Sequence, residues 1–167
     1  MPAQATVLQT DSELYSREIL GPAWFDIYSL RIEGTAGMPA MPDQVGATQS
    51  KYIVASSETV VASLKLRFNK SPLTALLMCL GISLKVNFHF EGFGPAPEID
   101  LSTAVTTTKD TYDYELSLAF TPEARGLTDG LYEIAATVEV GPGCDPCAQH
   151  VFGRGYIQEF LLQVYSG

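Results

Sequence analysis

The residues most able to do chemistry are two cysteines and a histidine near the C-terminus, Cys144, Cys147 and His150. Thiolate and imidazole are the donors that zinc prefers, so this short segment could supply most of a zinc site. A tetrahedral site needs a fourth ligand, for which the sequence offers Cys79, His89 or a second copy of the chain. Zinc binding is therefore one hypothesis for this segment.

The Cys-x-x-Cys spacing of Cys144 and Cys147 is also found in redox pairs, whose reactive thiol is activated at a helix N-terminus. Here Gly141, Pro142 and Gly143 come just before the pair and predict a bent loop instead of a helix. We therefore favour a structural loop, with or without a disulfide between the two cysteines, over the metal and redox hypotheses.

The remaining polar residues do not assemble into a catalytic motif in the sequence. His89 has the outward register of an alternating segment, which predicts a solvated surface imidazole, and no Ser or Cys stands beside it as a nucleophile. Acidic residues gather in predicted loops without the spacing of a calcium loop. No glycine-rich stretch opens a helix, as phosphate binding requires. The sequence predicts no catalytic residues.

Residues 71–80 are unusual because they join two strong strand predictions, where a polar turn would be expected. They instead carry five Leu or Met side chains. Two hypotheses follow: the segment covers one end of the core, or it projects and docks on another chain. The candidate interaction residues here are Leu73, Leu76, Leu77 and Met78.

An aromatic stretch at residues 14–28 adds two further interaction candidates, Trp24 and Phe25. Trp is enriched at interface centres, but the single Trp of a small domain is more often a core residue. The core interpretation is therefore favoured for Trp24.

Strands must position all of these residues, because period-two alternation is the dominant pattern of the chain. It is clearest at residues 60–68 and 82–91, and it recurs at 112–120 and 131–140. The last predicted strand, 156–165, is apolar on both faces more often than the others, which favours a central or sheet-covered position. Weaker strand predictions cover 23–33, 51–56 and 101–108. Helix is confined to two short candidates, 11–19 and 74–80.

Seven or eight strands separated by turn-forming clusters predict an all-β fold, an antiparallel β-sandwich formed as a single domain over residues 1–167. Residues 1–22 are a candidate N-terminal extension. Leu127, Gly130 and Tyr132 stand just before a strand near the C-terminus, and this run resembles the tyrosine corner of immunoglobulin-like domains. The resemblance implies an immunoglobulin-like sandwich in which the Tyr132 hydroxyl bonds back to the preceding corner.

Composition and charge exclude several classes of function. Ten Lys and Arg against nineteen Asp and Glu give a net charge of −9, which repels nucleic acids and anionic membranes. The longest apolar run, residues 73–84, is too short to span a bilayer, so no membrane insertion is expected. The N-terminus lacks a signal-peptide pattern and the three cysteines are sparse, which favours a cytoplasmic protein.

These observations favour a non-enzymatic protein-interaction or assembly module that binds a protein partner or its own copies. A metal-binding domain that uses Cys144, Cys147 and His150 is the first alternative. A small-ligand or carbohydrate-binding sandwich is the second, with aromatic candidates Tyr112, Tyr156 and Phe93.

Overall fold

The computed structural model describes residues 11–13, 23–34, 53–143, 145–147 and 150–166. Within these ranges the chain is mostly β, with one α-helix. The elements in chain order are β1 (Asp11–Glu13), β2 (Phe25–Gly34), β3 (Ile53–Ala55), β4 (Val60–Phe68), α2 (Pro72–Leu80), β5 (Ser83–Gly92), β6 (Glu98–Thr106), β7 (Asp113–Phe120), η2 (Glu123–Arg125), β8 (Gly130–Gly141), η3 (Asp145–Cys147) and β9 (Gly153–Tyr165).

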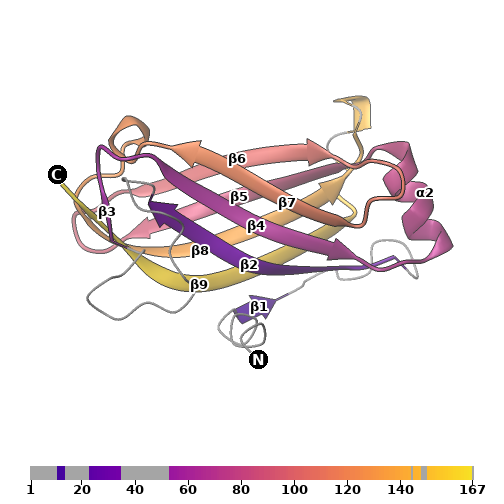
Figure 1. Cartoon of the computed structure of the whole chain (residues 1–167), viewed down its shortest axis with the longest axis horizontal. Coiled ribbons are helices and arrows are strands. Elements are labelled where there is room, and N and C mark those ends of the chain that lie inside the picture. Colours follow the sequence, from indigo (N-terminus) through magenta and orange to yellow (C-terminus); the bar gives the residue numbers. More distant parts are fainter. Residues whose placement is uncertain (1–10, 14–22, 35–52, 144, 148–149, 167) are drawn as a thin grey trace.

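The strands form two sheets that face each other across one apolar core (Figure 1). The larger sheet has the order β1-β9-β8-β5-β6, with β3 also paired to β9, and the smaller has the order β2-β4-β7. All pairs are antiparallel except β3 with β9, which is parallel. The predicted all-β, two-layer fold is confirmed, with this one parallel pair as an exception to the antiparallel arrangement.

Alternation identified the core face of the strongest strands correctly. In β4 the side chains of Val60, Ala62, Leu64, Leu66 and Phe68 are buried, and the intervening residues are half-buried or exposed. The same holds for the inward residues of β5 and β8. Each large apolar side chain that leaves water contributes about 1.5–3 kcal/mol to folding as an upper estimate. This burial, repeated along both sheets, sets the face that each strand turns inward.

In β2 the alternation changes phase because the strand contains a β-bulge. Phe25 and Ile27 are buried in one phase, and Leu30 and Ile32 are buried in the other. The register with β4 shifts between Tyr28 and Arg31, and the inserted Ser29 has a φ of 53°. This extra residue explains why the strand was a weak prediction from periodicity alone.

The two helix predictions had different outcomes. The helix predicted over residues 74–80 is confirmed as α2, which begins two residues earlier. The helix predicted over residues 11–19 is wrong at its start, because Asp11–Glu13 pair with β9 as strand β1. Backbone pairing to a neighbouring strand outweighs the weak local capping signal there. Residues 14–22 lie outside the described residues.

The loops divide between two ends of the sandwich. Residues 69–82, 107–112 and 142–152 connect strands at the end where α2 lies (Figure 1). Residues 56–59, 93–97 and 121–129 connect strands at the opposite end. None of the described helices is long and apolar enough to cross a membrane. We call these two regions the α2 end and the opposite end.

Candidate functional site

The helix α2 forms because its first and last turns are capped by local sequence. Ser71 is extended (φ −131°) and its hydroxyl accepts a hydrogen bond from the Thr74 N–H at 3.2 Å. Pro72 follows at the first helical position, where a missing N–H costs nothing. Gly81 ends the helix in the left-handed region (φ 74°) and donates its N–H to the Met78 carbonyl at 3.3 Å. The helix therefore has defined limits at both ends.

The inner face of α2 is fixed to the sandwich by apolar and polar contacts. Leu77 and Met78 are buried in the core, and Thr74 is buried with them. The Thr107 hydroxyl donates to the Met78 carbonyl at 3.2 Å and accepts from the Ile82 N–H at 2.9 Å. These bonds satisfy backbone groups at the C-terminal end of the helix. The sequence left two hypotheses for residues 71–80, a cover over the core or a docking surface. The inner face of α2 acts as the cover.

The outer face of α2 presents an apolar surface to solvent. Leu76 and Leu80 are one turn apart and are 53% and 67% exposed. Cys79 is exposed between them. The helix sequence PLTALLMCL contains no charged residue on either face. We call Leu76, Cys79 and Leu80 the α2 ridge, and it is the candidate interaction surface at this end.

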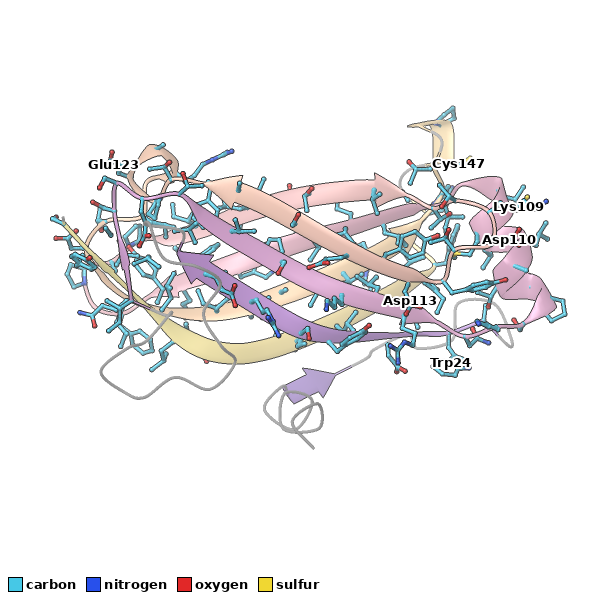
Figure 2. The ribbon with its side chains drawn as sticks, viewed as in Figure 1. Trp24, Lys109, Asp110, Asp113, Glu123 and Cys147 are labelled. Atoms are coloured by element: carbon cyan, nitrogen blue, oxygen red, sulfur yellow. The ribbon has the colours of Figure 1, made fainter. Side chains whose placement is uncertain are left out.

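The other predicted interaction residues are not on this ridge. Phe25 lies in the core, as Met78 and Leu77 do, and Leu73 is half-buried against the core. Trp24 is half-buried at the α2 end, the same end as Lys109, Asp110 and Asp113 (Figure 2). Asn69 holds the Trp24 backbone in place, because its side-chain oxygen accepts the Trp24 N–H at 2.9 Å and its own N–H bonds the Trp24 carbonyl. Of the six predicted residues, only Leu76 is well exposed.

Exposed apolar side chains occur elsewhere as well. Those outside α2 are Ile53, Phe93, Val105, Leu131, Leu161 and Tyr165. Ile53 directly follows residues 35–52, which lie outside the described residues. Of the exposed apolar side chains that the structure describes, Leu76 and Leu80 have the two largest exposed fractions, 53% and 67%, and they lie one turn apart on one helix. This is why we base the interaction argument on α2.

The predicted metal ligands are only partly described. Cys147 ends η3 and is exposed, and its carbonyl accepts the N–H of His150, whose side chain is also exposed. Cys144 lies outside the described residues. No group of three His, Cys, Asp or Glu side chains in the described part of the chain is placed to hold a metal ion. A Cβ at Gly143 would collide with the carbonyl oxygen of Gly81, so this loop packs against the end of α2.

The outer face of the larger sheet carries a hydrogen-bonded group of three polar side chains that the sequence did not reveal. His89 lies on the outer face of β5, as alternation predicts, and both of its ring nitrogens have partners. Its Nδ1 lies 2.6 Å from Asp100 Oδ1 on β6, and its Nε2 lies 2.9 Å from Thr137 Oγ1 on β8. Only strand register could have found this set, because the three residues lie far apart in sequence.

A small hollow lies next to this group of three side chains. It has a volume of about 230 Å³ and its lining includes Thr137, Glu139, Arg154 and Tyr156. The order hydroxyl, imidazole, carboxylate is that of a nucleophile, a general base and the group that orients the base. Thr137 bonds to His89 and also lines the hollow, so its hydroxyl could contact a small molecule bound there.

The aromatic residues of the ligand-binding alternative are not brought together. Tyr156 lines the hollow and is half-buried. Tyr112 is half-buried at the α2 end with the Lys70 ammonium 5.8 Å from its ring centre. Phe93 is exposed after β5, at the opposite end, where its N–H bonds the Leu131 carbonyl. A shared stacking surface of these three rings is absent.

The outer face of the smaller sheet carries a charged cluster around Arg67. Arg67 donates to Asp113 at 3.0 Å, and its guanidinium lies 5.2 Å from the centre of the Tyr28 ring. The hydrogen bond to the Asp113 carboxylate is the main cause that raises the pKa of Arg67 further above its ordinary value. Both partners are well exposed to solvent, so this pair adds little to stability.

Comparisons with known proteins do not assign this chain to a family. The sequence matches no protein-family model, and a search of the curated proteins found no match. The functional argument therefore depends on the geometry described above.

Proposed function

We propose that this domain is a non-enzymatic protein-interaction module that packs the α2 ridge into an apolar groove of a partner protein. The observation that carries the proposal is the exposure of Leu76 and Leu80 on a helix whose other face is fixed in the core. Large apolar side chains that stay in water on a rigid element favour a protein partner. The caps on both helix ends mean that little ordering entropy is lost when a partner binds.

The test uses the full chain as bait in an extract of its native cells. We expect a partner that binds the wild type and is lost with both Leu76→Asp and Leu80→Asp. The matched control is Ser117→Asp, which adds the same charge at an exposed position of β7 and should retain the partner. Circular dichroism of each variant confirms that it is folded. Equal capture by the wild type and both α2 variants would contradict the proposal, and so would no partner at all.

A second candidate function is ester hydrolysis at Thr137. It is favoured by the hydrogen bonds from His89 to Thr137 and to Asp100, next to the hollow. Thr137 Oγ1 would attack the ester carbonyl and pass its proton to His89, which then protonates the departing alcohol; water releases the acyl group by the same route. Arg154, which also lines the hollow and lies 4.0 Å from the Glu139 carboxylate, is the cation that would stabilise the oxyanion.

p-Nitrophenyl acetate is the probe for this second candidate. We expect the wild type to release p-nitrophenol faster than Thr137→Val and His89→Ala, because the first variant removes the nucleophile and the second removes the base. Glu91→Gln is the matched control, because Glu91 lies on the same face of β5 but is paired with Glu133 and not with Thr137, and this variant should keep the wild-type rate. Equal rates for the wild type and Thr137→Val would remove hydrolysis from consideration.

Two finer predictions remain proposals. The immunoglobulin-like class is supported by the hydroxyl of Tyr132, which donates to the Thr128 carbonyl at 2.6 Å as a tyrosine corner would. A cytoplasmic location is supported by the sparse cysteines, three in the whole sequence, because a reducing compartment does not favour dense disulfide frameworks. A zinc site at Cys144, Cys147 and His150 stays an alternative that elemental analysis of the protein, purified without a metal-affinity step, would decide.

A further inference from the structure

Most of the exposed large apolar side chains gather on one part of the larger sheet. Eight such side chains are exposed in the described part of the chain, and two of them belong to the α2 ridge. Five others lie on the outer face of the larger sheet near the opposite end: Ile53, Phe93, Leu131, Leu161 and Tyr165. Figure 1 shows β3 and the C-terminal end of β9 at this end. We call these five side chains the sheet patch.

Strand pairing makes the sheet patch contiguous. Leu131 on β8 and Ile53 on β3 are paired with Gln163 of β9 from its two sides. Leu161 and Tyr165 stand two residues before and two residues after Gln163, on the same face of β9. Neighbouring positions on one face of a sheet lie about 5–7 Å apart, so long side chains at these positions contact one another. The patch is therefore one surface that surrounds Gln163.

Phe93 extends the sheet patch beyond Leu131, because its N–H donates to the Leu131 carbonyl at 2.9 Å. Toward α2, the same face of the sheet is polar instead. Its exposed and half-buried side chains there include Lys85, His89, Thr137, Glu139 and Arg154. Single exposed apolar side chains are ordinary on soluble proteins, whereas a contiguous group marks a site of interaction. The patch is such a group, and it is confined to one end of the face.

A row of three glutamates borders the sheet patch on the side toward α2. Glu91 on β5 is paired with Glu98 on β6 and with Glu133 on β8. Glu133 is in turn paired with Leu161 of the patch. Glu91 and Glu98 are exposed, and neither forms an ion pair with any residue that the structure describes. Like charges placed opposite each other on a sheet repel, so this glutamate row favours a cation beside the patch.

The size and the charge of this surface restrict what can cover it. Its five side chains are 38–50% exposed and present roughly 400 Å² of surface, whereas a stable dimer of whole domains buries about 800 Å² on each partner. A second copy would also bring its own net charge of −9 to an acidic border, and an anionic membrane is repelled in the same way. A short segment with one apolar and one basic side fits both the size and the charge.

We propose that the sheet patch binds a basic amphipathic helix of another protein. The apolar side of the helix lies on the patch, and its Lys or Arg side chains lie on the glutamate row. A helix with one apolar stripe covers the face of a sheet in the same way within many domains. The sheet patch and the α2 ridge lie toward opposite ends of the sandwich, so this inference goes beyond the interaction proposed for α2.

The probe is a synthetic helical peptide of about 18 residues, with Leu on one face and Lys on the other, whose binding to the full chain is measured by fluorescence anisotropy. We expect binding that weakens as salt is raised, because the carboxylates attract the peptide by charge. Leu131→Ser and Leu161→Ser should each weaken binding by about five- to tenfold, because each removes apolar contact. Leu80→Ser, the same change on the α2 ridge, is the matched control and should bind as the wild type does.

The glutamate row is tested by variants that lower the net charge equally. Glu98→Gln should weaken binding of the Leu/Lys peptide by about two- to fivefold and reduce its salt dependence, because it removes a carboxylate beside the patch. Glu115→Gln, at an exposed position of β7 in the other sheet, is the matched control and should leave binding unchanged. A peptide with Glu in place of every Lys should not bind.

Four results would overturn the inference. The first is no binding of the Leu/Lys peptide by the wild type, and the second is equal binding of the Lys and Glu peptides. The third is loss of binding with Leu80→Ser but not with the two patch variants, which would move the site to the α2 ridge. The fourth comes from sedimentation equilibrium of the chain alone: a dimer that Leu131→Ser dissociates would mean that a second copy covers the patch.

Discussion

The two ends of the sandwich are covered by different means. At the α2 end a capped helix places Leu77 and Met78 over the core and turns Leu76 and Leu80 toward solvent. At the opposite end, residues 121–129 fold back as a loop.

In that loop Leu127 is buried, while Glu123 and Arg125 of η2 are exposed. The position of Glu123 at this end is visible in Figure 2. This loop covers the core with Leu127 and Pro122, which are both buried, and leaves charged side chains in water. A helix with apolar residues on all sides covers the core and also leaves an apolar outer face, which is why we place the interaction surface on α2.

The largest expected effect tests the inner face of α2. Met78→Ala should lower the free energy of unfolding by about 2–5 kcal/mol, because it leaves a cavity in the core. It also removes the sulfur that the Tyr114 hydroxyl approaches at 3.3 Å. Urea unfolding followed by circular dichroism measures the change. Leu76→Ala on the outer face is the control and should change stability by less than about 0.5 kcal/mol. Equal losses for both variants would mean that the helix has no distinct inner face.

A smaller effect is expected from the loss of the hydrogen bond between the Tyr132 hydroxyl and the Thr128 carbonyl at the opposite end. Tyr132→Phe should cost about 1–2 kcal/mol, because it leaves the Thr128 carbonyl without its hydrogen bond while the ring stays buried. Tyr165→Phe, at an exposed ring of β9, is the matched control. Unfolding midpoints in urea measure both. If Tyr132→Phe behaves like the control, the hydroxyl contributes nothing to this end.

The smallest effect tests the helix cap. Ser71→Ala should cost about 1 kcal/mol and Ser71→Gly only a few tenths, because glycine tolerates the cap position better than alanine does. The loss should be concentrated in α2, whose amides would exchange faster than those of β4 and β5. If Ser71→Ala costs nothing, the Ser71 hydroxyl does not stabilise α2, and the helical cover is held by its core contacts alone.

Much of the fold could be predicted because the burial of one face of a strand produces alternating apolar and polar residues in the sequence. The alternation of β4 and β5 identified their inward residues, and the helix predicted over residues 74–80 lies within α2, although the cap at Ser71 was missed. The start of β6 was missed, because Glu98 and Asp100 do not resemble strand residues. Their exposed positions on an edge explain how the strand tolerates them.

The candidate site was harder to predict. The sequence grouped Leu76 with Leu77 and Met78, but a helix turns neighbouring residues by about 100°, so Leu76 faces water while the other two face the core. The contact of His89 with Asp100 and Thr137 needed the pairing of three strands.

The sequence by itself determined most of the strands, which of their faces is buried and that a helix forms over residues 74–80, because these depend on periodicity and on residues next to one another in the chain. The tertiary structure alone decided which strands are neighbours, which side chains meet across them and that β6 is left at an edge. A period of two fixes the face of a strand and carries no information about the strand beside it.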